Sequence, residues 1–159
     1  MKRIFAAMVA MVFVLCFSAC SKTPQEHIDY FNKVTETMKA LEDAVKQMNT
    51  ALAAVDNTNP DTLPPLLDAC QQVQNAAQAL EGLSAPEKFA QVQQLYIEAG
   101  EDISAGCDSY IKAYSGLFEQ DDTVGFPFEE LQTQAAQYMA SSAEKLTQAG
   151  KQHEDLMNT

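Results

Sequence analysis

Residues 34–55, VTETMKALEDAVKQMNTALAAV, carry the most regular apolar pattern in the chain. Seven apolar residues recur there at alternating steps of four and three: Val34, Met38, Leu41, Val45, Met48, Leu52 and Val55. This heptad spacing places them along one side of an α-helix, so it predicts an amphipathic helix that packs against other helices. The helix can open at Thr23-Pro24, because proline fits the first helical turn. We expect it to end near Asp56, before the turn sequence Asn57-Thr58-Asn59-Pro60.

Residues 63–82 show a second helical pattern. Its apolar stripe is Leu63, Leu66, Cys70, Val73, Ala77 and Leu80. We expect Thr62 to cap its first turn, which also holds two prolines, and Gly82 to end it.

A third helix is expected from Ser84, because Ser84-Ala85-Pro86-Glu87 has the form of a capping box. Its apolar residues are Phe89, Val92, Tyr96, Ala99, Ile103, Cys107, Tyr110, Tyr114 and Leu117. Gly100 and Gly106 are weak points inside it, and the phase of the stripe breaks near Ile103. The third helix spans about 33 residues against about 20 in the second, so it should overhang the second helix or bend.

A fourth helix follows a connection that contains Asp121, Asp122 and Gly125, and Pro127 can open it. Its stripe is Phe128, Leu131, Ala135, Met139, Ser142, Leu146, Ala149, His153 and Leu156. Four amphipathic helices with short connections predict an all-α fold, an antiparallel four-helix bundle with up-down-up-down topology.

The charge of the chain excludes two classes of partner. It has 22 acidic and 10 basic residues, and no arginine follows position 3. Nucleic-acid binding requires a basic surface that displaces counterions, and adsorption on anionic lipid headgroups requires the same sign of charge. We therefore expect no nucleic-acid partner and a well solvated, self-repelling surface.

The first twenty residues have the form of an export signal. Lys2 and Arg3 precede an unbroken apolar run over residues 4–17, and Phe17-Ser18-Ala19-Cys20 ends with small residues before a cysteine. The run is 14 residues long. Because about 20 residues are needed to cross a bilayer core, a membrane-spanning helix is the weaker interpretation.

This pattern resembles the lipobox of bacterial lipoproteins, although Phe17 stands where that family usually has Leu. The resemblance implies that residues 1–19 are a cleaved signal peptide, that Cys20 receives a thioether-linked diacylglycerol, and that the new amino terminus is acylated, as with palmitate. Ser21 rather than Asp follows the cysteine, which implies the outer membrane, facing the periplasm, in an organism with two membranes. An ordinary cleaved signal or an uncleaved anchor is the alternative. Residues 20–26 would then be a lipidated tether and residues 27–159 the bundle domain.

The sequence lacks the motifs of common catalytic and cofactor sites. Glu-x-x-His pairs, Cys-x-x-Cys, phosphate-binding loops and Gly-x-Ser-x-Gly do not occur. Glu98, Glu101 and Asp102 form one acidic patch, and Asp121 and Asp122 form another, but such groups are typical of solvated surface. We expect neither an enzyme nor a bound cofactor.

Two groups of residues could take a ligand. Tyr96, Tyr110 and Tyr114 could line a cleft, although tyrosines on a core stripe are usually core residues. His27 and His153 are weak metal candidates, because the start of the first helix and the end of the fourth should lie together in an up-down-up-down bundle. Zinc or copper requires three or four ligands in fixed geometry, so two surface histidines on fraying ends is the simpler interpretation.

Cys70 and Cys107 are candidates for a disulfide. They are the only thiols left after removal of the leader and lipidation, and an exported chain meets an oxidising environment. The expected register opposes the bond, because a reversal near Ser84 pairs Cys70 with a residue near 99, about 12 Å from Cys107. A disulfide requires Cα atoms within about 7 Å. A bond and two unpaired core thiols both stay open at this point.

Two functional classes remain. The first is a non-catalytic module for protein interaction or scaffolding, tethered by lipid in the cell envelope. The alternative is a helical bundle that binds a small molecule or a metal. The Ser-Ala-Pro-Glu start with Phe89, Tyr96, Tyr110 and Tyr114 resembles uncharacterised small helical-bundle lipoproteins of bacteria, and this resemblance implies no catalytic residue.

Overall fold

The computed structural model describes residues 24–119 and 125–158, and within these residues it contains four long helices and no strand. The long helices are α1 (Gln25–Ala54), α2 (Pro64–Glu81), α3 (Ala90–Glu119) and α4 (Phe128–Met157). Two short 3-10 helices, η2 (Pro60–Thr62) and η3 (Glu87–Phe89), precede α2 and α3. The prediction of an all-α protein with four helices is confirmed.

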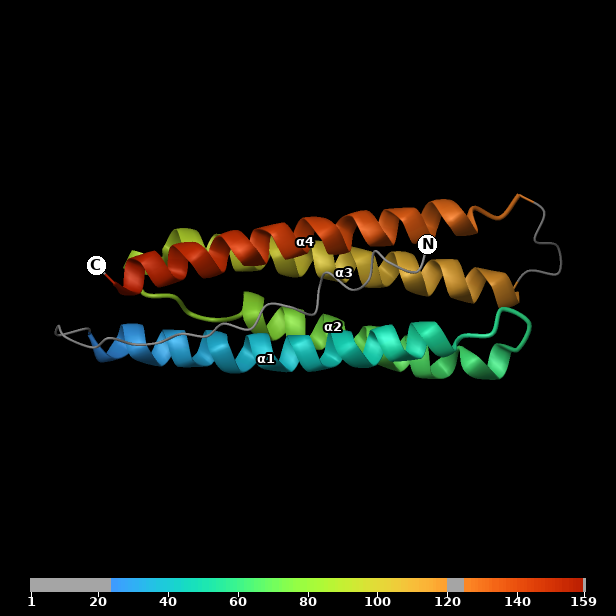
Figure 1. Ribbon diagram of the computed structural model, residues 1–159, viewed down its shortest axis with the longest axis horizontal. Coiled ribbons are helices and arrows are strands. Elements are labelled where there is room, and N and C mark those ends of the chain that lie inside the picture. Colours follow the sequence, from blue (N-terminus) through green and yellow to red (C-terminus); the bar gives the residue numbers. More distant parts are fainter. Residues whose placement is uncertain (1–23, 120–124, 159) are drawn as a thin grey trace.

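The long helices lie along the long axis of the molecule (Figure 1). α1 lies beside α2, α3 lies beside α4, and α2 also packs against α3. α1 begins and α4 ends at the same end of the molecule, near the connection between α2 and α3 (Figure 1). None of the helices within the described ranges is long and apolar enough to cross a membrane.

The predicted stripes supply most of the core. On α1 the residues Val34, Leu41, Val45 and Met48 are buried, and the other members of the heptad stripe are partly buried. α3 and α4 make the most extensive helix–helix contact. A side-chain carbon added at Gly106 would lie 3.0 Å from Cε of Met139, so the absence of a side chain there lets the two helices approach closely.

Two predicted helix caps are wrong. Thr62 does not cap α2, because its hydroxyl donates to the Asn59 carbonyl at 2.7 Å and accepts the Asp56 N–H at 3.0 Å. It closes the turn after α1 instead. The capping box at Ser84 and Glu87 is not formed, and α3 begins only at Ala90. A proline disfavours helical geometry at the residue before it, which prevents a helix from starting across Ala85-Pro86.

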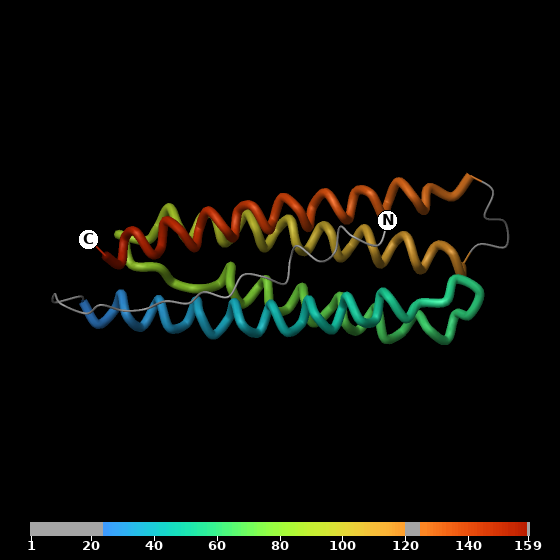
Figure 2. Tube along the Cα trace, viewed as in Figure 1, coloured from blue at the N-terminus to red at the C-terminus, as the bar shows by residue number. Residues whose placement is uncertain are grey.

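The connection between α2 and α3 sets the register of the two helices. After Gly82 the chain runs on past the end of α2 and reverses only near η3 (Figure 2). α3 therefore overhangs α2. Gln74 of α2 donates to Asp108 of α3 at 2.8 Å, so each residue of α2 faces a residue several positions further along α3 than a reversal at Ser84 predicts.

Candidate functional site

Three sulfur atoms from three helices meet in the core. Cys70 of α2 and Cys107 of α3 are free thiols without exposed surface, and Met48 of α1 is 1% exposed. The Cys107 thiol donates to Sδ of Met48 at 3.9 Å, and the Cys107 side chain also interacts with that of Cys70. We refer to Met48, Cys70 and Cys107 as the sulfur cluster. The expected separation of about 12 Å between the cysteines is wrong, because the connection after Gly82 shifts the register.

The contact between the two thiols affects their ionisation in opposite directions. The hydrogen bond from Cys107 lowers the pKa of Cys70, because it stabilises the Cys70 thiolate. The same bond, together with burial, raises the pKa of Cys107.

The three tyrosines proposed as a ligand face lie in the core. Tyr96 and Tyr110 are each 1% exposed and Tyr114 is 7% exposed. Burial raises the pKa of all three phenols. The Tyr114 hydroxyl accepts a hydrogen bond from Gln132 of α4 at 2.8 Å, so it joins α3 to α4.

An imidazole–aromatic cluster fills the end of the bundle where α1 begins and α4 ends. Its members are His27, Tyr30, Phe31, Phe89, Tyr96 and His153. The His153 ring stacks on Tyr30 with a centroid distance of 5.2 Å, and the Phe89 ring lies 4.8 Å from it. The cluster therefore ties α1, η3, α3 and α4 together.

His153 is a buried, neutral imidazole. It is 2% exposed, and desolvation lowers its pKa to about 4. Its Nδ1 lies 3.4 Å from the Tyr96 hydroxyl, whereas its Nε2 has no hydrogen-bond partner among the described residues. The sequence contained a signal for this burial, because His153 falls on the apolar stripe of the fourth helix.

The ring of Phe89 contacts both histidines, so His27 and His153 lie at the same end of the molecule. Nε2 of His27 lies 3.8 Å from a carboxylate oxygen of Glu26. Over residues 24–119 and 125–158, no group of three or more His, Cys, Asp or Glu side chains is arranged to hold a metal ion.

Gln93 is a buried connection that the sequence pattern did not reveal. It is 7% exposed, and its amide nitrogen donates to the carbonyls of Leu80 and Glu81, each at 3.0 Å. Its amide oxygen accepts the Tyr30 hydroxyl at 2.7 Å. Gln93 thus satisfies the last carbonyls of α2 and links them to α1.

The acidic patch on α3 has a structural partner. Lys145 of α4 pairs with Asp102 at 2.7 Å and also donates to the Glu98 carbonyl at 3.4 Å. Asp121 and Asp122 lie outside the described residues. The carboxylate of Asp102 therefore joins α3 to α4 through Lys145.

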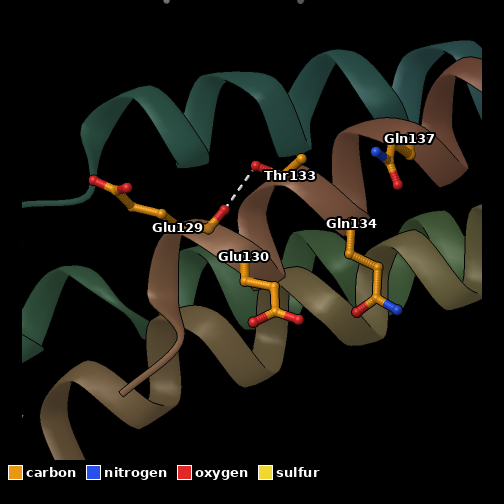
Figure 3. Close-up of a pocket in the computed structure, with 5 residues that line it drawn as sticks. All are labelled: Glu129, Glu130, Thr133, Gln134 and Gln137. Atoms are coloured by element: carbon orange, nitrogen blue, oxygen red, sulfur yellow. Dashed lines mark hydrogen bonds between the residues drawn. The ribbon is translucent and has the colours of Figure 1, made fainter. Parts of the chain in front are cut away.

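A hollow of about 400 Å³ lies at the start of α4 (Figure 3). Its lining is polar: Glu129, Glu130, Thr133, Gln134 and Gln137. The Thr133 hydroxyl donates to the Glu129 carbonyl at 2.8 Å, which is an ordinary bond within the helix. This hollow is open, so it differs from the enclosed pockets that hold most small ligands.

No known protein family, curated protein or solved structure matches this chain. The predicted lipid attachment at Cys20 lies outside the described residues.

Proposed function

We propose that this chain is a lipid-anchored, non-catalytic module for protein interaction or scaffolding in the bacterial cell envelope. The observation that carries the proposal is the leader, in which Lys2 and Arg3 precede a 14-residue apolar run and Phe17-Ser18-Ala19-Cys20. Lipid on Cys20 would hold the helical domain at the membrane, facing the periplasm from the outer membrane in an organism with two membranes.

The helices of this domain are proposed to form an antiparallel bundle with up-down-up-down topology. Contacts between α1 and α2, α2 and α3, and α3 and α4 support this arrangement, since consecutive antiparallel helices are neighbours in such a bundle. The common position of the start of α1 and the end of α4 supports it as well.

The three tyrosines that could have lined a ligand cleft instead fill the interior of the domain. Tyr96, Tyr110 and Tyr114 are buried against neighbouring helices. The exterior is therefore the part of the domain available to a partner. With 22 acidic against 10 basic residues, this exterior suits a partner surface that carries positive charge.

The alternative is a bundle that binds a small molecule or a metal at the imidazole–aromatic cluster. The free Nε2 of His153 favours it, because a nitrogen without a hydrogen-bond partner could accept a ligand. Calorimetric titration of the purified domain with zinc and copper at neutral pH tests this function. Stoichiometric binding that His153→Phe abolishes would support it over the scaffolding function.

Replacement of Cys20 tests the anchor. Cys20→Ala should abolish incorporation of labelled fatty acid and release the protein from the membrane fraction, or leave the leader uncleaved, because the thioether requires this thiol. Cys16→Ala, four residues earlier in the same leader, is the matched control and should be lipidated normally. Equal labelling of both variants would remove the lipoprotein function.

Site-specific crosslinking tests the interaction. A photoreactive residue at exposed Gln134, on the hollow at the start of α4, should give a discrete adduct in intact cells, which mass spectrometry then identifies. The same residue at exposed Gln72, on α2, is the control. An adduct that is lost in Cys20→Ala would support an anchored partner. The absence of any adduct from a series of exposed positions on all four helices would contradict it.

A further inference from the structure

Two members of the sulfur cluster are thiols, which can form a covalent bond as well as pack. Cys70 and Cys107 are free thiols and both are fully buried. Gln74, one helical turn after Cys70, hydrogen-bonds to residues of α3 on both sides of Cys107. We propose that Cys70 and Cys107 form a disulfide in the exported protein and that this bond fastens α2 to α3. The proposal rests on the proposed export, because structural disulfides persist in oxidising compartments.

The position of the pair explains what such a bond would do. α1 and α2 form one helix pair, and α3 and α4 form the other. The most extensive contact between the two pairs is that of α2 with α3. A covalent bond there would join the two pairs at a point where no connection of the backbone crosses. The disulfide would thus fix the register of one pair on the other.

Polar contacts next to the cysteines hold the same register independently of sulfur. Gln74 lies one helical turn after Cys70, and its amide donates to Asp108 at 2.8 Å and to the Ser104 carbonyl at 3.4 Å. Both acceptors flank Cys107 on α3. The two thiols are therefore held opposite each other by their helices, as a disulfide requires.

The bond forms by exchange with a donor disulfide, such as an oxidised dithiol protein of the envelope. One cysteine, as the thiolate, attacks a sulfur of the donor and releases one donor thiolate, which gives a mixed disulfide. The second cysteine, as the thiolate, attacks the sulfur of the first and releases the second donor thiolate. The two cysteines lose two protons and two electrons, and the donor is reduced to two thiols.

The burial of the pair sets the order of events. Neither sulfur is exposed in the folded protein, so the donor must react before α2 and α3 have packed together. For the same reason, a reductant in solution cannot reach the finished bond until the protein unfolds. This bond is therefore a permanent crosslink of the fold.

Mass spectrometry of the exported protein is the test. The protein is unfolded in excess iodoacetamide without reductant, and we expect no alkylation and a mass lower by two hydrogen atoms, about 2 Da. Reductant together with denaturant should give two alkylated cysteines. Reductant without denaturant should give none, because the folded core shields the bond.

A leaderless protein, made in the reducing cytosol, separates this proposal from the proposed export. It should carry two free thiols and should gain the bond when it is unfolded and refolded with oxidised glutathione. Failure to form the bond in that refolding would overturn the proposal whatever the fate of the leader. Two free thiols in exported protein whose leader has been removed would overturn it too, whereas an unprocessed leader would count against the proposed function alone.

Discussion

His153 makes the stability of the domain depend on pH. Its pKa is about 4 in the folded protein, against an ordinary value near 6.5. The unfolded chain thus binds more protons between these two values, so the free energy of unfolding falls as the pH falls from about 6.5 to about 4. The shift corresponds to a loss on the order of 3 kcal/mol at pH 4. Urea denaturation at a series of pH values measures this loss.

Replacement of the imidazole tests the cause of that dependence. His153→Phe keeps an aromatic ring among Tyr30 and Phe89 but cannot be protonated, so the fall in stability over this pH range should become much shallower. His27→Gln, in the same cluster, is the control and should retain the slope. An unchanged slope in His153→Phe would assign the pH dependence to other groups.

Gln93 should be among the costliest polar residues to replace. Gln93→Ala would take the Gln93 partner from the Glu81 carbonyl and the Tyr30 hydroxyl. It would also remove a hydrogen bond to the Leu80 carbonyl, which keeps the Leu83 N–H at 3.4 Å. Because each buried polar group that loses its hydrogen bond costs about 1–3 kcal/mol, we expect a loss of about 2–4 kcal/mol in the free energy of unfolding. The exposed neighbour Gln94 is the matched control, and Gln94→Ala should change stability by less than about 0.5 kcal/mol. Equal effects of the two substitutions, measured by urea denaturation, would refute the role of Gln93.

The sequence could not reveal Gln93, and the reason is physical. Exposed glutamines occur on all four helices, and nothing in its local sequence distinguishes Gln93 from them. Its amide acquires partners only because the end of α2 lies beside it, which depends on how two helices pack. Cys70 and Cys107 differ in this respect, since their positions on apolar stripes predicted burial correctly.

Among the elements, α3 and α4 depend on a close approach at Gly106. A side chain there would meet Met139 at 3.0 Å and the Ala135 carbonyl at 3.4 Å. Gly106→Val should therefore lower the free energy of unfolding by about 1–3 kcal/mol, as overpacking of a core does. Lys112→Val, on an exposed face of α3, controls for helix propensity. It should lower the free energy of unfolding by roughly a few tenths of a kcal/mol. A Gly106→Val protein as stable as the control would mean that α4 can move away at no cost.

The elements themselves were largely predictable, whereas their starting points were not. The heptad stripe and the turn after it predicted α1 closely, because both signals are local. The predicted start of α3 was wrong. Ser84 and Glu87 can form a capping box only if Ala85 adopts helical geometry, and Pro86 disfavours that geometry in the residue before it. Buried Phe89 then fixes the reversal of the chain, and that packing could not be inferred from a spacing rule.

At the scale of the whole molecule, the oxidation state of Cys70 and Cys107 should set the stability. A disulfide closes a loop of about 37 residues, and the entropy removed from the unfolded chain corresponds to about 3–4 kcal/mol. Oxidised protein should therefore unfold at a higher urea concentration than the same protein after reduction in denaturant and refolding. A Cys70→Ser, Cys107→Ser protein should be insensitive to reductant. Coincident curves for oxidised and reduced protein would show that the bond does not stabilise the fold.

The number of helices followed from the sequence, but the way they register did not. Each stripe specifies which face of a helix is buried and leaves free how far one helix slides along another. Five residues connect α2 to η3, and the chain continues past the end of α2 before it reverses. This connection determines how far α3 is displaced along α2, and so it brings Cys70 and Cys107 together.

The arrangement of the helix ends also determines how far the domain reaches. α4 starts at the end of the molecule opposite the start of α1 (Figure 1). α1 has 30 residues, so these two points are separated by about 45 Å along the axis. With lipid on Cys20 and the long axis upright on the membrane, the hollow would stand at about that height above the headgroups. A protein that binds at this height must itself project from a membrane or occupy the space between two of them.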